Sequence, residues 1–178
     1  MKYLEKIFCP YCGGHLERFI DHEGKQRLKC RRCRAIIYEN PIPASALVIP
    51  SPDDPHRILL VKRAVEPCKG EYSLSGGFME IDETAEECAI REMLEETGFH
   101  GRIKNLLGIN SQPSPQYKMV LIFGYEMEII GGKLAPSDDA QDAAFFPLDN
   151  HPKIAFETHQ HFVDIYEREI QGSKIITD

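Results

Sequence analysis

One stretch of this chain, from Gly77 to Phe99, constrains the fold more than any other. It reads GFMEIDETAEECAIREMLEETGF. The run from Thr84 to Glu87 is a capping box, and Gly98 is typical of the residue that ends a helix. We therefore predict a helix from Ala85 to about Thr97.

Three glutamates, Glu92, Glu95 and Glu96, share one face of this helix. At about 100° per residue they fall within one arc of roughly 100°. Carboxylates so close repel one another, and the stretch contains no lysine to neutralise them. A solvated acidic helix is the alternative, but it leaves the preceding Gly76-Gly77 pair unexplained. The pattern indicates a divalent-metal site that handles phosphate.

The other residues of the helix suggest how it packs. Ile90, Met93 and Leu94 form an apolar face on the same wheel. Cys88 lies on the inward arc and should be buried. Arg91 can reach glutamates one turn away, so we expect it to steady a carboxylate.

Two cysteine pairs mark residues 1–39 as a separate unit. Seventeen residues separate Cys9-Pro-Tyr-Cys12 from Cys30-Arg-Arg-Cys33. This is zinc-ribbon spacing, and four thiolates suit the tetrahedral geometry of Zn²⁺. So small a unit cannot bury enough core alone, so the metal would supply stability. Two disulfides or four unrelated thiols are the alternative.

Asn40-Pro41-Ile42-Pro43 predicts a stiff joint, because proline restricts its own backbone and that of its neighbour. We place the domain boundary there, with a larger domain at residues 40–178. Loops are predicted at residues 111–117 and at the acidic residues 137–142, and a turn at Gly131-Gly132. Strands are predicted at residues 15–20, 25–29, 44–50, 57–63, 101–110, 119–129 and 143–147, and a second helix at 155–170.

Composition and charge narrow the function classes. Hydrophobic residues make up 42% of the 178, and no apolar run approaches the roughly 20 residues that span a bilayer. The start lacks the features of a signal peptide, so we expect a cytoplasmic protein with reduced thiols. The net charge of −7 argues against a protein that coats nucleic acid.

The helix and the residues before it resemble the Nudix box at nine positions. These are Gly77, Glu83, Arg91, Glu92, Met93, Glu95, Glu96, Gly98 and Phe99. The resemblance implies an α+β protein with the Nudix α/β/α sandwich and a mixed sheet, preceded here by the small zinc ribbon. It also implies Mg²⁺- or Mn²⁺-dependent hydrolysis of a nucleoside diphosphate linked to another group.

The resemblance also implies roles for individual residues. Glu92, Glu95 and Glu96 would bind the catalytic metal, and the Gly77 carbonyl would join its shell. Arg91, with Glu83, would orient the helix and its loop.

The general base can come from either of two segments of the chain. Glu92 or Glu95 on the helix can serve, or an aspartate from a downstream loop. Among Asp138, Asp139 and Asp142 we favour Asp142, because it directly precedes a predicted strand. A solvated acidic loop is the alternative for these aspartates.

We expect the substrate to be contacted by Arg63, Gly76, Tyr72, Phe78 and Tyr117. The three aromatic rings can stack on an adenine or a flavin. Packing in the core or at its rim is the alternative for each ring.

Two groups within the family combine such a ribbon with the Nudix box. The NADH pyrophosphatase group carries Ser-Gln-Pro-Trp-Pro-Phe-Pro, whereas this chain reads SQPSPQY at residues 111–117 and lacks the Trp and the Phe. Plant-type hydrolases of FAD and ADP-ribose lead from ribbon to domain through an Asn-Pro joint, as here at Asn40-Pro41. An ADP-containing small-molecule substrate is therefore favoured, FAD or ADP-ribose first, with AMP as a product.

Three alternatives remain open. The enzyme could be an NADH pyrophosphatase or an RNA-cap hydrolase. A different class is a nucleotide-sensing regulator that binds nucleic acid through the basic run at residues 29–34. We regard nucleic acid as an unlikely partner, because few aromatic residues accompany the run. A buttress for the catalytic domain or a homodimer interface is the expected role of the basic ribbon.

Overall fold

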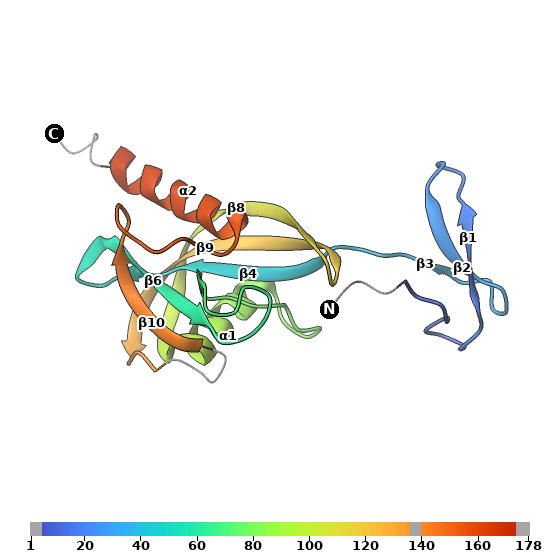
Figure 1. The fold of residues 1–178 in the computed structure, drawn as a ribbon, viewed down its shortest axis with the longest axis horizontal. Coiled ribbons are helices and arrows are strands. Elements are labelled where there is room, and N and C mark those ends of the chain that lie inside the picture. Colours follow the sequence, from blue (N-terminus) through green and yellow to red (C-terminus); the bar gives the residue numbers. More distant parts are fainter. Residues whose placement is uncertain (1–4, 136–139, 174–178) are drawn as a thin grey trace. The chain divides into compact units, whose positions relative to one another are not determined.

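The structure is a computed structural model that describes residues 5–135 and 140–173 (Figure 1). The chain divides into two compact units. The first comprises Met1–Pro41 and Pro113–Met119, and the second Ile42–Gln112 and Val120–Asp178. The division between residues 39 and 40 stays a prediction. The sequence pattern did not indicate that Pro113–Met119 groups with the first unit.

The first unit contains a small antiparallel sheet in the order β1-β2-β3. The predicted hairpin is present, because β1 pairs with β2 along its whole length. Its turn is held by Asp21, whose Oδ1 accepts hydrogen bonds from the backbone of Glu23 and Lys25 at 2.9 and 2.8 Å. The strands are β1 (Leu16–Ile20), β2 (Gln26–Cys30) and β3 (Ile36–Ile37).

The second unit contains two sheets. One has the order β10-β6-β5, with β7 also paired to β6, and the other has the order β4-β9-β8. Because β4 and β9 are parallel while β6 and β10 are antiparallel, the architecture is mixed, as predicted. The strands are β4 (Ile42–Val48), β5 (Pro50–Ser51), β6 (Asp54–Arg63), β7 (Tyr72–Ser73), β8 (Phe99–Ser114), β9 (Lys118–Gly132) and β10 (Ala140–Pro147).

Two helices, α1 (Ala85–Thr97) and α2 (Glu157–Ser173), cover opposite sides of these strands (Figure 1). Alternate residues of a strand face opposite ways. Residues such as Leu47 and Leu59 therefore share a buried cluster with Met93 of α1. On the other side Phe162 of α2 fits so closely over Gly124 that a Cβ there would collide with the ring. The helices thus form an α/β/α sandwich, and the predicted fold class is confirmed.

The predicted loops differ from the structure in three places. We expected a loop at Ser111–Ser114, but strand β8 continues through these residues. A strand at the edge of a sheet, as β8 is, tolerates a proline such as Pro113. Gly131 and Gly132 end strand β9 instead of forming a turn after it. Asp142 lies in β10, opposite Lys62, and not in a loop. Asp138 and Asp139 lie outside the described residues.

The predicted apolar face of α1 is partly wrong. Met93 is fully buried, but Ile90 and Leu94 are each 43% exposed. The buried residues of the helix are Cys88, Ala89, Met93 and Thr97. The buried side of the helix therefore lies closer to the glutamates than predicted. The reason is that Glu92 and Glu96 face the loop before the helix, where they contact Gly77 and Gly76.

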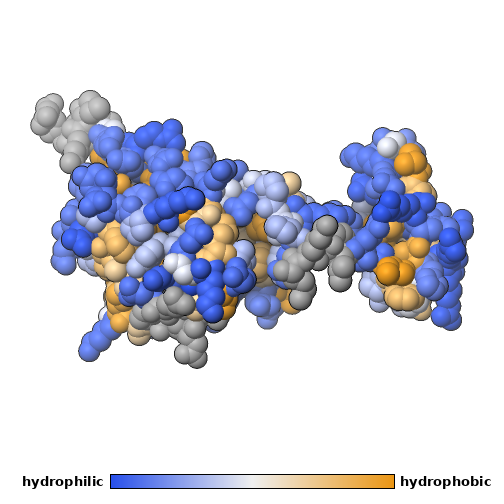
Figure 2. All heavy atoms as spheres, in the orientation of Figure 1, coloured by the Kyte–Doolittle hydropathy of each residue, from blue (hydrophilic) through white to orange (hydrophobic). Residues whose placement is uncertain are grey.

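The face of the molecule in Figure 2 is largely hydrophilic, with scattered apolar side chains. Several of them lie in the first unit, among them Phe8 and Ile20, which are 58% and 65% exposed. Among the described residues, no helix combines the length and the apolar character needed to cross a membrane.

Candidate active site and zinc site

Helix α1 begins and ends as its sequence predicts. The Thr84 hydroxyl accepts a hydrogen bond from the Glu87 N–H at 3.2 Å, and the Glu87 carboxylate accepts one from the Thr84 N–H at 2.8 Å. Gly98 has a φ of 74° and donates its N–H to Leu94. These two ends set which residues of the helix reach the site.

The Gly76-Gly77 loop runs between β4 and α1. The Gly77 carbonyl accepts a hydrogen bond from the Ser45 N–H at 2.9 Å. Gly76 has a φ of +143°, and a Cβ on it would overlap the Ser45 carbonyl. A Cβ on Gly77 would overlap the Glu92 carboxylate. Gly76 therefore lets this loop approach the backbone of β4 closely, and Gly77 leaves room for the Glu92 carboxylate in its present position.

Arg91 connects three of the glutamates. Its Nε and Nη2 donate to the two carboxylate oxygens of Glu83, at 2.9 and 2.6 Å. Its Nη1 donates to Glu92 at 2.7 Å and to Glu95 at 3.0 Å. Nη2 also reaches the Phe78 carbonyl at 3.1 Å. The guanidinium thus joins the helix to the loop that precedes it.

The carboxylates differ in their environment. Hydrogen bonds from Arg91 hold the pKa of Glu83 at about 2. Burial raises the pKa of Glu92 despite the contact with Arg91. Burial also raises the pKa of Glu96, although the Gly76 N–H donates to it at 2.9 Å. Glu92 and Glu96 are thus partly desolvated carboxylates, and a nearby cation would stabilise their ionised form.

The donor set fits a hard divalent cation. Mg²⁺ prefers oxygen ligands, often one or two carboxylates completed by water and phosphate. Glu92 and Glu96 offer partly buried carboxylates, and the Glu95 side chain is 58% exposed. Glu92 is bonded to Arg91 and Glu96 to Gly76, which holds the two carboxylates apart. Among the described residues, the three glutamates do not come close enough to form a compact ligand cluster of the kind that four cysteines form in the first unit. The place of the Gly77 carbonyl in a metal shell stays a prediction.

Two of the predicted substrate residues, Arg63 and Tyr72, lie on the paired strands β6 and β7. Arg63 ends β6, and its charge acts on Glu96. Tyr72 pairs with Lys62 across the β6–β7 ladder, and its hydroxyl donates to Asp142 at 3.4 Å. Phe78 is 44% exposed beside Arg91. The structure thus brings Asp142 to the Tyr72 side of the site.

Tyr117 is different, because it belongs to the first unit. Its hydroxyl accepts a hydrogen bond from the Gln116 amide at 2.9 Å. Its contact with substrate stays a prediction.

Sequence reasoning missed the start of α2. Phe156, just before the helix, lies 5.1 Å from the Arg63 guanidinium, measured to the ring centroid, and the charge of Arg63 acts on His159 in the first turn. No motif marks these residues. Their neighbourhood follows from the tertiary fold.

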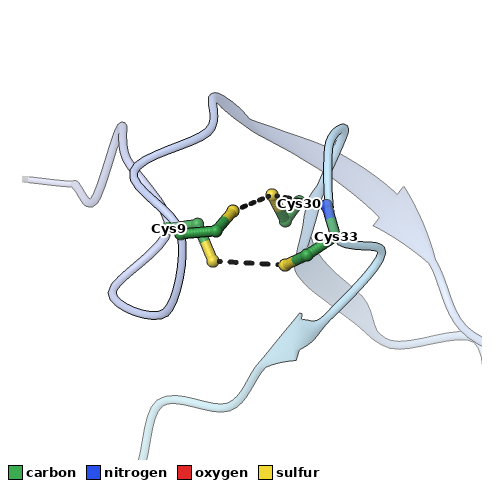
Figure 3. A group of neighbouring side chains, drawn as sticks. Cys9, Cys30 and Cys33 are labelled. Atoms are coloured by element: carbon green, nitrogen blue, oxygen red, sulfur yellow. Dashed lines mark hydrogen bonds between the residues drawn. The ribbon is translucent and has the colours of Figure 1, made fainter.

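Four cysteine sulfurs converge in the first unit (Figure 3). The Sγ atoms of Cys9, Cys12, Cys30 and Cys33 all lie within 4.8 Å of one another. Two of the separations are 3.7 and 3.5 Å, far longer than a disulfide bond of about 2.05 Å. Sulfurs about 2.3 Å from a central Zn²⁺ would lie roughly 3.8 Å apart at tetrahedral corners. The cluster therefore fits zinc.

The backbone around the cluster favours a thiolate. The N–H groups of Cys33 and Arg32 donate to Cys30 Sγ and lower its pKa to about 6. Gly14 packs so closely that a Cβ on it would come within 3.0 Å of the same sulfur. Such donors are what a metal-bound thiolate requires.

Comparisons with known proteins agree with the geometry of helix α1 and its carboxylates. The family model for the NUDIX domain matches residues 41–164. An ADP-ribose pyrophosphatase from Methanocaldococcus jannaschii is 44% identical over 115 residues, 64% of this chain and 67% of that protein. The NAD-capped RNA hydrolase NudC from Pseudomonas aeruginosa is 30% identical over 162 residues, 89% of this chain but 55% of that protein.

A solved structure resembles nearly the whole chain. It is a NUDIX hydrolase from Nitrosomonas europaea, with a TM-score of 0.80, 27% identity and 93% coverage of each chain. The box geometry on α1, the family match and this likeness point the same way. The chain belongs to the NUDIX hydrolase family.

Proposed function

We propose that this protein hydrolyses the diphosphate linkage of ADP-ribose, or of a closely similar ADP derivative, with Mg²⁺ or Mn²⁺. The observation that carries the proposal is the arrangement of three carboxylates beside the Gly76-Gly77 loop: Arg91 donates to Glu92 and Glu95, and the Gly76 N–H donates to Glu96. The products would be AMP and ribose 5-phosphate.

The chain's own residues supply positioning and charge. Glu92, Glu95 and Glu96 would hold the cation, which, when bound, neutralises phosphate oxygens and lowers the pKa of a coordinated water. Arg91 keeps Glu83 and Glu92 in place, so the helix carboxylates hold their directions relative to the loop. A water would attack one phosphorus, the bridging P–O bond would break, and the other phosphate would leave.

Glu92 is a reasonable general base on physical grounds. Burial raises its pKa, which makes the carboxylate a stronger base than an exposed glutamate. Glu95 and Asp142 stay alternatives. Asp142 accepts a hydrogen bond from Tyr72, which would orient it if it served as the base.

ADP-ribose is favoured over FAD for one reason. The relative named ADP-ribose pyrophosphatase is 44% identical over 115 residues, which make up 64% of this chain. FAD was expected equally from the ribbon and the joint, and nothing in the comparisons named above singles it out.

NAD-capped RNA is the second candidate. NudC proteins align with 89% of the chain, so the likeness includes the first unit. The chain spans only 55% of that relative, however, and it lacks the aromatic residues of the SQPWPFP motif. NADH, the substrate of the NADH pyrophosphatase group, contains the same diphosphate linkage as a small molecule.

A hydrolysis panel tests the proposal. Wild-type protein would be assayed with Mg²⁺ and with Mn²⁺ on ADP-ribose, FAD, NADH and NAD-capped RNA. We expect the highest kcat/KM on ADP-ribose, with AMP released. Higher kcat/KM on capped RNA would favour the second candidate.

The metal assignment has its own control. Glu95→Gln should reduce turnover at least about 100-fold, whereas Glu169→Gln, at an exposed position of α2, should not. Absence of turnover on the whole panel, with the divalent cation still bound, would favour the nucleotide-sensing regulator.

Three further features belong to the proposal. We propose that the four cysteines bind one structural Zn²⁺, supported by their mutual distances. Cysteines without disulfide partners suit a reducing compartment, which supports a cytoplasmic enzyme. A homodimer stays a prediction, to be tested by the mass of the protein in solution.

A further inference from the structure

Two buried side-chain polar atoms have no hydrogen-bond partner in residues 5–135 and 140–173. They are Ser75 Oγ and His159 Nδ1. Ser75 lies beside Glu96 and lowers the pKa of that carboxyl, although its hydroxyl falls short of hydrogen-bond geometry. It therefore belongs to the site already described. His159 has no such explanation.

His159 lies in the first turn of α2, against an aromatic ring. Its imidazole meets Phe156 edge to face, with 5.0 Å between ring centroids. The same Phe156 ring carries the Arg63 guanidinium at 5.1 Å. Burial, and then the charge of Arg63, lower the pKa of His159 to about 3. The ring is therefore neutral at physiological pH and able to accept a hydrogen bond.

Arg63 has unused donors, and it contacts the same Phe156 ring as His159. Its Nε donates to the Pro67 carbonyl at 2.7 Å. Neither Nη makes a hydrogen bond with any residue in the described parts of the chain. The same guanidinium acts electrostatically on Glu96 of the catalytic helix. A cation with free donors thus acts on the Glu96 carboxylate and contacts the same Phe156 ring as the unpaired acceptor, His159.

The first turn of α2 is held in place by the strands around it. The Ala155 N–H donates to the Tyr72 carbonyl at 2.8 Å. The Thr158 hydroxyl donates to Gln112 at 2.5 Å. Since these contacts fix the turn, a side chain on it can direct Arg63.

An apolar residue would fill the position of His159 without leaving a buried nitrogen unpaired. We propose that His159 is a positioning residue whose Nδ1 accepts a hydrogen bond from one Nη of Arg63 when the other Nη engages the diphosphate. This inference rests on the proposed function, since it assigns a phosphate contact to Arg63. It adds α2 to the substrate-binding machinery.

A double-mutant cycle tests the pairing. His159→Phe removes the acceptor, His159→Gln keeps one, and Arg63→Gln removes the cation. On the best substrate of the wild type, His159→Phe should lower kcat/KM about tenfold, mainly through KM, as expected for a hydrogen bond to a charged group. His159→Gln should recover most of the loss, and His159→Phe should have little further effect in the Arg63→Gln background.

A second readout does not require turnover. ¹⁵N spectra of the histidine rings would be recorded while the full chain with Mg²⁺ is titrated with inorganic pyrophosphate. The His159 Nδ1 resonance should shift toward that of a hydrogen-bonded acceptor in the wild type and stay in place in Arg63→Gln. If ADP-ribose is not hydrolysed but this shift occurs, the proposed substrate fails and the pairing stands.

Exposed His161, two residues along the same helix, provides the matched control. His161→Phe should change neither kcat/KM nor the His159 resonance. Additive losses from His159→Phe and Arg63→Gln, or no His159 shift with pyrophosphate, would overturn the inference. So would equal losses from His159→Phe and His159→Gln with a lowered Tm, which would mean that the ring only fills space.

Discussion

Arg91 and Glu83 form a two-pronged ion pair across the start of α1, with N–O distances of 2.9 and 2.6 Å. The Glu83 side chain is only 12% exposed and that of Arg91 28% exposed, so water screens the pair incompletely. The planar fork of arginine matches a carboxylate, and a lysine ammonium cannot reproduce it.

We expect Arg91→Lys to reduce kcat/KM about 10- to 100-fold, because Glu83 and Glu92 would lose their common anchor. Steady-state kinetics on ADP-ribose measures this. Arg102→Lys is the matched control, since Arg102 pairs with Glu128 at the surface and is 66% exposed. Equal activity in both variants would show that the fork of Arg91 is not needed.

The pKa of Glu83 predicts a pH-dependent stability. Its folded-state value of about 2 lies below the ordinary 4.5. The ionised group therefore stabilises the fold above pH 4.5, and this contribution is lost as pH falls through about 2. Glu83→Gln should be less stable than wild type at pH 7, with the difference shrinking toward pH 2. Chemical denaturation across this range measures it, and a difference independent of pH would contradict the linkage.

Glu96 should behave in the opposite sense, because burial raises its pKa. Its ionisation destabilises the fold, so wild type loses stability as pH rises through the raised value. Without added divalent cation, Glu96→Gln should melt at a higher temperature than wild type at pH 8, while activity falls at least about 100-fold. Differential scanning calorimetry from pH 4 to 8 measures this, and a lower Tm at pH 8 would contradict it.

Gly76 is required by both backbone conformation and space. Its φ of +143° is unfavourable for other residues, and a Cβ would overlap the Ser45 carbonyl. Gly76→Ala should destabilise the protein by about 2 kcal/mol or more and move the N–H away from Glu96. Gly172→Ala, in open space near the end of α2, should be neutral or stabilising by up to about 1 kcal/mol. Urea denaturation of the two variants compares them.

The ribbon should depend on its metal. We expect about one zinc per chain in the wild type, and a loss of zinc in Cys30→Ser with local unfolding of the hairpin. Cys68→Ser is the control, because Cys68 lies outside the cluster. Elemental analysis and amide NMR report on metal and fold. Full zinc content in Cys30→Ser would exclude the four-thiolate site.

Much of the catalytic helix could be predicted, because its signals are local. The capping box at Thr84 and the left-handed Gly98 both have the geometry that their spacing indicates. The arc facing the core could not be predicted from apolar residues alone. Ile90 and Leu94 remain exposed because the loop before the helix brings Glu92 and Glu96 inward.

The sequence by itself determined the family, the helix ends and the cysteine spacing, since each depends on residues close together along the chain. Only the tertiary structure decided which side chains surround the carboxylates. Asp142 meets Tyr72 because β10 and β7 pair with the same strand, β6. His159 approaches Arg63 because the start of α2 is bonded to Tyr72 and Gln112. Such contacts depend on packing between distant segments, which no local pattern encodes.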